Sequence, residues 1–329
     1  MSLPKRRLGT SDLRITPVGI GTAPIGSNRD WVIYWGETDE KTAIDTIHTA
    51  LDSGVNWIDT APFYGWGRAE RIVGEALKGR RDDAFVFTKC GTIRTARRPD
   101  GSDFGDDLRP ASIRKEVEES LARLQTDHID LYQMHDPDPK VPIEDSWGEI
   151  YRLIDHGKVR YAGLSNHPVE LIERAAKVGP VTSLQAEYSP LFRETEDSFP
   201  FLSKNNIGLL GWGSLAEGFL ADGFNLDSLP PDDFRRTRHR FGKPESYEEI
   251  KRIRKSLLEI AGRRGVSLVS LVIAWELSHQ ELTGAIMGVK NPTESVEMAK
   301  AATAKLSRAD IADFEEVLAG WKARRVGVA

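Results

Sequence analysis

Four side chains that can move or hold a proton end short apolar segments of the sequence or follow them closely. They are Asp59, Tyr64, Lys89 and His135. A phenol has an ordinary pKa of about 10 and becomes a usable acid when a nearby cation stabilises its phenolate. Lys89 can supply that cation, and Asp59 can pair with Lys89 and hold it in place. His135 can hydrogen-bond a carbonyl oxygen and orient it. The set therefore predicts proton transfer to or from an oxygen, with Tyr64 as the acid or base.

A metal site formed by Asp59, His135 and Asp136 is the competing interpretation. Imidazole nitrogens and carboxylate oxygens bind divalent ions. However, no second histidine ends another apolar segment, because His128 begins its segment and His167 has no carboxylate beside it. We therefore expect no metal.

The elements that must position these residues follow a regular order. Short β-branched segments alternate with longer amphipathic ones, which is typical of repeated βα units and a parallel sheet. The predicted strands are residues 17–21, 55–59, 84–88, 128–134, 159–163, 182–186, 207–211 and 283–287. The predicted helices are residues 40–53, 69–77, 111–124, 145–154, 169–176, 196–204, 247–262, 268–277, 293–301 and 308–318.

Eight strands without a linker or a shift in composition predict one domain over residues 1–329, an α/β fold of the (β/α)8 TIM-barrel type with extra C-terminal helices. Residues 6–15 are expected to form an N-terminal β-hairpin that turns at 10–12 and plugs the bottom of the barrel. Catalytic groups of such barrels lie at the C-terminal ends of the strands. The residues singled out above occupy those ends.

Composition excludes several classes of protein. The chain has 45 Lys and Arg against 50 Asp and Glu, a net charge of −5, and a single cysteine, Cys90. One cysteine forms no intramolecular disulfide, and mild acidity disfavours nucleic acid as the main partner. No apolar stretch approaches the roughly 20 residues of a membrane span, and residues 1–7 do not resemble a secretory signal. We expect a cytoplasmic protein that acts on small molecules. The sequence leaves its oligomeric state open.

Two local patterns have alternative interpretations. The segment 211–216 fits the G-x-G-x-x-A dinucleotide fingerprint, but glycines and prolines follow it in place of a helix, so we reject a Rossmann unit. The basic run 235–240 is expected to be a solvated loop, with an anion contact or a lid as the alternative.

Several blocks agree in order with the aldo-keto reductase superfamily, which the chain resembles over nearly its whole length. The blocks are residues 8–10, 19–22, 59–65, 87–89, 129–135, 157–160, 163–166 and 185–189. The resemblance implies an NAD(P)-dependent oxidoreductase of the alcohol dehydrogenase (NADP+) type, which interconverts a carbonyl compound and an alcohol by direct hydride transfer. It implies Asp59, Tyr64, Lys89 and His135 as the catalytic residues, with Tyr64 as general acid/base. The alternative is a non-catalytic, nicotinamide-binding regulatory protein on the same barrel.

The resemblance also implies a coenzyme site. Ser165, Asn166 and Gln185 are expected at the nicotinamide carboxamide, and Tyr188 or Trp212 against the ring. Ser214 is expected to donate to a phosphate, because the family's usual aromatic-Ser-Pro-Leu-Ala reads Trp-Gly-Ser-Leu-Ala here. The whole expected set is Gly21, Thr22, Asp59, Ser165, Asn166, Gln185, Tyr188, Trp212, Gly213, Ser214, Leu215, Ala216, Gly218, Gly288, Lys290, Glu294 and Glu297.

Two residues of this set give opposite indications of the coenzyme. Lys290 is placed where a basic residue meets the ribose 2′-phosphate, and helix 293–301 offers its N-terminus to an anion, which favours NADPH. Glu294 would repel a phosphate and accept a hydrogen bond from a free hydroxyl, which favours NADH. Glu297 remains as the main adenine contact. We expect NADPH in preference to NADH.

Aromatic residues are frequent in the loops above the predicted strand ends. They are Trp31, Tyr34, Trp35, Phe63, Trp66 and Phe104. Aromatic walls suit an apolar carbonyl substrate, and a tryptophan also suits the face of a sugar. The sequence leaves both substrate classes open, together with simple packing of the loops on the barrel.

Overall fold

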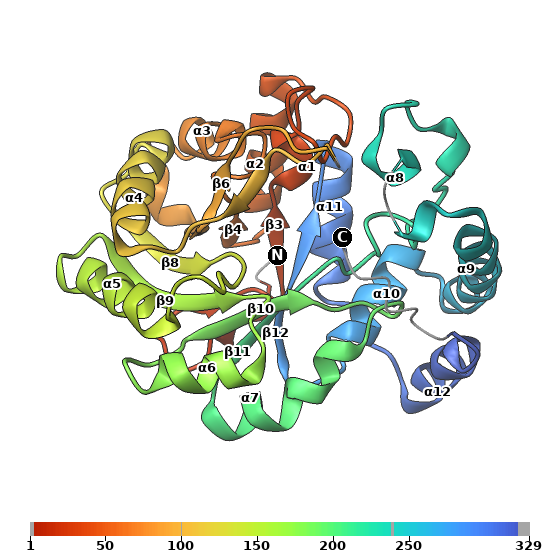
Figure 1. The fold of residues 1–329 in the computed structure, drawn as a ribbon. Helices are drawn as coiled ribbons and strands as arrows, with labels where there is room; N and C mark the ends of the chain where they lie inside the picture. Colours follow the sequence, from red (N-terminus) through yellow and green to blue (C-terminus); the bar gives the residue numbers. More distant parts are fainter. Residues whose placement is uncertain (1–2, 100, 238–239, 322–329) are drawn as a thin grey trace.

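Eight parallel strands form a closed barrel in the computed structural model, which describes residues 3–99, 101–237 and 240–321 (Figure 1). In spatial order they are β10 (Ser183–Glu187), β11 (Gly208–Trp212), β12 (Leu282–Gly288), β3 (Val18–Gly21), β4 (Trp57–Asp59), β5 (Phe85–Cys90), β8 (Ile129–Met134) and β9 (Val159–Ser165). The chain is a (β/α)8 barrel, as the alternation of segments predicted. All eight predicted strands are present.

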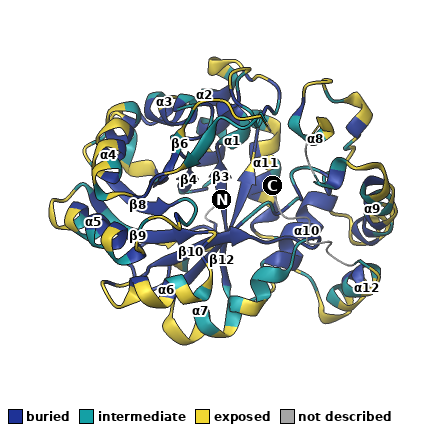
Figure 2. Cartoon of the chain, in the orientation of Figure 1, coloured by how far each residue is buried: buried dark blue, intermediate teal, exposed yellow. Residues whose placement is uncertain are grey.

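Helices surround the strands in a ring (Figure 1). They are α2 (Glu40–Asp52), α3 (Arg68–Ala76), α4 (Pro110–Leu124), α5 (Ile143–Asp155), α6 (Val169–Ala176), α7 (Phe199–Asn205), α10 (Leu268–Glu276) and α11 (Pro292–Ala301). In α3 the buried residues Ala69, Ile72, Val73 and Ala76 recur at the spacing of one helix face. Figure 2 shows the result, a buried centre and exposed outer helix surfaces.

Two further helices, α9 (Pro244–Arg264) and α12 (Arg308–Leu318), pack against one another outside this ring. The first turn of α12 begins at Ser307, whose hydroxyl accepts the amide of Asp310 while the carboxylate of Asp310 accepts that of Ser307. The short elements are α1 (Ala23–Gly26), α8 (Phe234–Thr237), η1 (Arg81–Asp83), η2 (Glu194–Ser198), η3 (Leu226–Ser228) and η4 (Arg240–Gly242).

The helix predicted over residues 196–204 is two elements, the 3-10 helix η2 and the α-helix α7. The α-helix starts at Phe199 with Pro200 in its first turn. Proline has no N–H to donate and its fixed φ suits the first turn of a helix. The proline therefore marks where the α-helix begins. None of the helices in the described ranges is long and apolar enough to cross a membrane.

A hairpin closes the N-terminal end of the barrel. It consists of β1 (Arg6–Arg7) and β2 (Arg14–Ile15), which are antiparallel. Its fully buried side chains join one apolar cluster with residues of the barrel strands: Leu8, Leu13, Ile15, Trp57, Phe87, Leu131 and Leu210. At Gly9 φ is +51°, and a Cβ there would lie 2.2 Å from the carbonyl oxygen of Thr182, so only glycine fits. The predicted bottom plug is confirmed.

A second hairpin, which the sequence analysis did not anticipate, follows β5. Its strands are β6 (Thr92–Arg94) and β7 (Phe104–Asp106), and Arg94 pairs with Phe104. Because its strands are short and flanked by charged residues, they lack the apolar alternation of a predictable strand. The hairpin carries Phe104 to the ring of Phe63 at the strand ends.

Candidate active site

Three adjacent strands bring the proton-handling residues together. Asp59 ends β4, Lys89 lies near the end of β5, and His135 follows β8. Strand β5 pairs with β4 on one side and β8 on the other. The backbone N–H of His135 donates to the carbonyl oxygen of Cys90 at 2.9 Å. The parallel register therefore places all three residues at the same end of the barrel.

The ammonium group of Lys89 is held by three oxygen atoms. Its Nζ lies 2.7 Å from Oδ1 of Asp59, 3.0 Å from the carbonyl oxygen of Thr60 and 3.1 Å from the hydroxyl of Tyr64. The side chains of Lys89 and Asp59 are 0% and 2% exposed. An ammonium has three donors, so each of these contacts can take one of them. Lys89 therefore has a fixed place beside the phenol.

The second carboxylate oxygen of Asp59 also has partners. Oδ2 accepts the side-chain amide of Gln185 at 2.7 Å and that of Gln133 at 3.4 Å. These contacts come from β10 and β8. Gln185, which was expected at a nicotinamide carboxamide, thus binds Asp59. Gln133 is a supporting residue that the sequence analysis missed, although it lies in β8, two residues before His135.

Burial and charge act in opposite directions on the pKa of Tyr64. Burial raises it above the ordinary value, Lys89 acts to lower it, and burial prevails. Lys89 thus acts on the pKa of Tyr64 in the expected direction, and burial outweighs it in the described structure. For Lys89 itself, burial acts to lower the pKa, but Asp59 and Tyr64 outweigh burial and the pKa is raised. The site therefore holds the protonated phenol of Tyr64 next to the cationic Lys89.

The ring of His135 lies at right angles to that of Tyr64, with 5.9 Å between the centroids. Burial, with a further contribution from Lys89, holds the pKa of His135 well below its ordinary value. The imidazole is therefore neutral near pH 7 and carries one N–H. It can donate a hydrogen bond to an oxygen without adding a charge.

Aromatic rings surround this pair. The ring centroid of Phe63 lies 5.3 Å from that of Trp31, 5.4 Å from that of Trp66 and 5.0 Å from that of Phe104. Of the other two aromatic residues expected here, Trp35 packs against Phe234 and Tyr34 lies under Arg29. The wall beside Tyr64 and His135 is therefore formed by Trp31, Phe63, Trp66 and Phe104, which we call the aromatic wall.

Comparisons with known proteins agree with this arrangement. The model of the Aldo/keto reductase family matches residues 17–319. The chain is 35% identical over 315 residues to the aldo-keto reductase YhdN of Bacillus subtilis, covering 94% of this chain and 92% of that protein. The chain belongs to the aldo/keto reductase family.

Other relatives of this reductase extend the comparison. An NADH-specific methylglyoxal reductase of Escherichia coli is 31% identical over 320 residues, covering 94% of this chain and 97% of that protein. The solved glycerol dehydrogenase of Gluconobacter oxydans is 33% identical, with a TM-score of 0.85 over 100% of this chain and 99% of that one. Members of this family are oxidoreductases that act on carbonyl compounds with nicotinamide coenzymes.

Asn166 and Trp212 form a polar group beside His135 in the reductase. The amide of Asn166 donates to Asp136 at 2.9 Å and accepts the indole N–H of Trp212 at 3.0 Å. Asn166 has φ of +59°, which is strained for a residue other than glycine and often marks a functional position. The neighbouring Ser165 hydroxyl is buried and has no hydrogen-bond partner within the described part of the chain. An unpaired buried hydroxyl fits a ligand that supplies its own polar group.

Three of the expected coenzyme residues lie at the ends of β3 and β12. Gly21 and Gly288 pair with one another, and the Thr22 hydroxyl donates to the carbonyl oxygen of Asp59 at 3.0 Å. A Cβ added at Gly21 would lie 2.9 Å from a methyl carbon of Ile286, so packing alone favours glycine there. Gly21 and Thr22 therefore lie beside Asp59, and Gly288 lies next to Gly21.

The segment 212–218, which was expected at the coenzyme phosphates, has an irregular backbone. Gly213 and Gly218 have φ of +76° and +95°, and Ala216 has φ of +47°. Its amides make short turns, with Ala216 donating to the carbonyl oxygen of Gly213 and Gly218 to that of Leu215. Ser214 is buried, and Leu215 packs against the apolar core. No α-helix follows directly, which agrees with rejecting a Rossmann unit.

Two expected coenzyme residues, Tyr188 and Glu297, have partners within the protein. Tyr188 is fully buried and stacks on Trp275 of α10, with 5.8 Å between their ring centroids, because the residue after β10 points outward to the helices. Glu297 accepts the hydroxyls of Ser267 and Ser270 at the start of α10. Tyr188 thus packs away from the strand ends, whereas the part of Glu297 in binding adenine stays a prediction. Of the two aromatic candidates for the nicotinamide ring, Trp212 remains.

The side chains of Lys290 and Glu294 both bind parts of the protein. Lys290 Nζ donates to the carbonyl oxygen of Trp35 at 2.7 Å, and burial lowers the pKa of this lysine. The carboxylate of Glu294 accepts the amide N–H of Lys290 and the side-chain amide of Asn291, each at 2.7 Å. Glu294 thus places its own negative charge beside the first turn of α11, where an anionic ligand was expected.

The basic run 235–240 is only in part the solvated loop that was expected: residues 238 and 239 lie outside the described residues, Arg236 and Thr237 are exposed, and Arg235 and Arg240 have partners. Arg235 pairs with Asp233 at 2.8 Å and lies 5.0 Å from the ring centre of Trp35, and its side chain is 12% exposed. Arg240 forms an ion pair with Glu187 at the end of β10. Burial raises the pKa of Glu187 to about 7, although Arg240 opposes the change. Glu187 was missed, but it lies two residues after Gln185 and so faces the same side of the strand.

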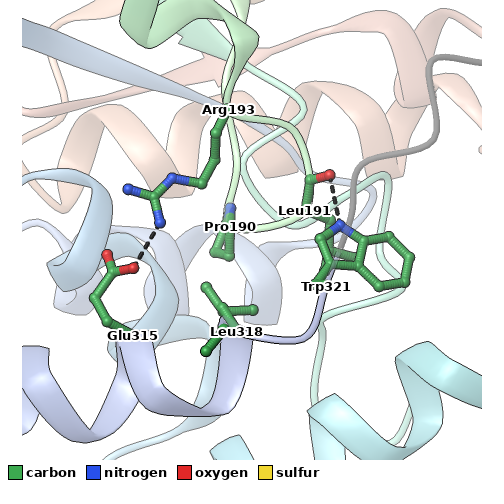
Figure 3. A pocket seen from close by; sticks show the side chains of 7 residues that line it. Pro190, Leu191, Arg193, Glu315, Leu318 and Trp321 are labelled. Carbon is green, nitrogen blue, oxygen red and sulfur yellow. Dashed lines mark hydrogen bonds and ion pairs between the residues drawn. The ribbon is translucent and has the colours of Figure 1, made fainter.

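Two other kinds of site remain to be considered, a metal site and a cavity. Among the described residues, no three His, Cys, Asp or Glu side chains gather as a metal site. A cavity of about 180 Å³ lies between the loop after β10 and α12 (Figure 3). Arg193 and Glu315 pair across it at 2.6 Å, and Trp321 donates to the carbonyl oxygen of Leu191 at 2.9 Å. Its lining shares no residue with the candidate active site. The cavity lies where the C-terminal helix α12 packs against the loop after β10.

Proposed function

We propose that the protein reduces a small aldehyde or ketone to an alcohol and catalyses the reverse oxidation, with Tyr64 as the general acid and base. The contact of Tyr64 with the buried Lys89 carries the proposal. The raised pKa of Tyr64 keeps the phenol protonated near neutrality, so that it can give its proton to the carbonyl oxygen. As the phenolate forms, Lys89 stabilises it at the same distance, without rearrangement.

The other residues orient the substrate, Lys89 and the coenzyme. The hydride that reaches the carbonyl carbon comes from a bound nicotinamide coenzyme. Neutral His135 donates its N–H to the carbonyl oxygen and directs it toward Tyr64. Asp59 keeps Lys89 charged and in place. Ser165, Asn166 and Trp212 are the polar groups available to the nicotinamide end of the coenzyme. The alternative, a binding protein without activity, has no observation in its favour.

For the coenzyme we propose NADH over NADPH, which departs from the expectation from the sequence. A carboxylate at position 294 beside the first turn of α11 disfavours a 2′-phosphate there, and Lys290 is engaged by Trp35. One relative is named for NADH specificity. For the substrate, the mutual contacts of the aromatic wall favour a small carbonyl compound, and two relatives are named for methylglyoxal and glycerol.

The test is oxidation of NADH and of NADPH by the purified protein with methylglyoxal, glyceraldehyde or benzaldehyde. We expect turnover with a small aldehyde and a higher kcat/KM for NADH. Loss of turnover in Tyr64→Phe, with the coenzyme still bound, would support the assigned role. Equal turnover in Tyr64→Phe would contradict it, and a preference for benzaldehyde would contradict the substrate class.

A further inference from the structure

A buried carboxylate lies behind the strand that carries Lys89. Glu116 of α4 is 7% exposed. Its Oε2 accepts the backbone N–H of Gly91 at 3.0 Å, and its Oε1 accepts the hydroxyl of Ser112 at 3.1 Å. Gly91 follows the last residue of β5, two positions after Lys89. Glu116 therefore binds the backbone at the point where β5 leaves the barrel.

No cation neutralises this carboxylate within the described residues. The groups that act on it are Ser112 and Glu119 from α4, Asp107 from the preceding loop, Cys90 from β5 and Tyr132 from β8. None of them is basic. Burial raises the pKa of Glu116 to about 7, so the buried group is charged in a large part of the molecules at neutral pH.

A second buried carboxylate on the same side of β5 does have a cationic partner. Glu70 of α3 accepts the hydroxyl of Thr88 at 2.6 Å, and Arg123 pairs with its other oxygen at 2.6 Å. Charge on Glu70 is compensated, whereas charge on Glu116 is not. A neutral side chain of the same shape at 116 would fit the site and avoid the desolvation of a carboxylate. Stability alone therefore does not favour glutamate at this position.

The backbone that Glu116 binds connects two candidate catalytic residues. Gly91 has φ of +97°, and its carbonyl oxygen accepts the amide of Asp107 at 2.8 Å. The carbonyl oxygen of Cys90, one residue earlier, accepts the amide of His135 at 2.9 Å. A shift of this short segment would thus move Lys89 and His135 relative to Tyr64.

We propose that Glu116 is a positioning residue, whose carboxylate fixes the end of β5 through the Gly91 amide and so sets Lys89 and His135 against Tyr64. The carboxylate accepts this N–H more strongly than a neutral acceptor would. The proposal rests on the proposed function for its effect on turnover, but the contact itself is independent of that function.

The test compares Glu116→Gln and Glu116→Ala with the wild type, and Glu118→Gln serves as the control because this exposed residue lies on the same helix and is not among the groups that act on Glu116. Glutamine keeps one acceptor and removes the charge. We expect Glu116→Gln to lower kcat roughly tenfold at about pH 8, with KM little changed, and to match the wild type at about pH 6. Glu116→Ala should be slower than Glu116→Gln, and Glu118→Gln should equal the wild type.

Two further measurements separate positioning from a structural role. The amides of Gly91 and His135 should exchange faster with solvent deuterium in Glu116→Gln than in the wild type. The melting temperature of Glu116→Gln at about pH 8 should equal or exceed that of the wild type, because a buried charge is removed. A lower melting temperature together with lower kcat would show a structural role and overturn the proposal.

Unchanged exchange at Gly91 with unchanged kcat would also overturn it. If the wild type shows no turnover, the proposed function fails by itself. Hydrogen exchange then still decides whether Glu116 holds the end of β5: faster exchange in Glu116→Gln supports the contact, and identical exchange rejects it.

Discussion

The Nζ atom of Lys89 lies 3.1 Å from the hydroxyl oxygen of Tyr64, and burial opposes the effect of this contact on the phenol. Burial holds the proton on Tyr64, while the lysine favours its departure. The balance suits an acid that must stay protonated until a substrate oxygen arrives. The pairing of Lys89 with Asp59 keeps the cation available at that moment.

Replacing the phenol tests this role. Tyr64→Phe should lower kcat by about 10²-fold or more, because it removes the proton donor and keeps the ring. The dissociation constant of the coenzyme, measured by quenching of tryptophan fluorescence, should change little. Phe63→Leu is the matched control, since Phe63 belongs to the aromatic wall and carries no proton. A Tyr64→Phe enzyme with wild-type kcat would refute the assignment.

The buried pair of Asp59 and Lys89 should be important for stability. Asp59→Asn leaves the Lys89 ammonium buried without a counter-charge, and we expect the free energy of unfolding to fall by about 3 kcal/mol. Urea denaturation measures this change. The exposed pair of Asp52 and Arg80 is the control, and Asp52→Asn should cost less than about 1 kcal/mol. Equal losses in the two variants would show that burial of the pair has no special effect.

Coenzyme preference should depend on Glu294. Glu294→Gln removes the charge beside the first turn of α11 and should raise the ratio of kcat/KM for NADPH to that for NADH roughly tenfold. Glu316→Gln, at an exposed position of α12 outside the expected coenzyme set, serves as the control. If the ratio is the same in both variants and the wild type, Glu294 has no part in coenzyme selection.

His167 should make the protein sensitive to acid. Burial lowers the pKa of His167 from 6.5 to about 4, so the unfolded chain takes up a proton before the folded one does. The stability contributed by neutral His167 is present above pH 6.5 and is lost as the pH falls toward 4. The loss reaches about 3 kcal/mol. His167→Asn should flatten this part of the curve of unfolding free energy against pH, and His156→Asn, at an exposed position, should not.

A chelator should leave the activity unchanged. The arrangement of Asp59 and Lys89 gives the carboxylate a cation already, and Asp136 accepts the amide of Asn166. Activity is measured before and after incubation with excess EDTA. Loss of turnover that a divalent ion restores would revive the metal interpretation.

The positions of the strands and of the four proton-handling residues could be predicted because both depend on local patterns. A β-branched segment followed by a polar residue marks a strand end in a parallel barrel. Helix α12 begins and ends at the predicted residues, since Ser307 and Asp310 determine its first turn. The family resemblance added the expected coenzyme residues.

The contacts that were not predicted join segments far apart in the sequence. The side chain of Glu297 binds α10, and Arg240 binds Glu187 across the loop that follows β11. No local pattern encodes such pairs. Tyr188 is a different case, because the alternation along β10 already assigns it to the side opposite Gln185. The direction of the Tyr64 pKa depends on burial, which the sequence does not quantify.

The hairpin of β1 and β2 closes one end of the barrel and leaves the end with the candidate active site open. Below Asp59 lies an apolar cluster that includes Trp57 and Leu8, and among the described residues this cluster separates Lys89 from the closed end of the barrel. On the proposed function, a proton that Tyr64 gives to the substrate is replaced from the open end of the barrel, where the product also departs. Release of the alcohol and reprotonation of Tyr64 would then share one passage.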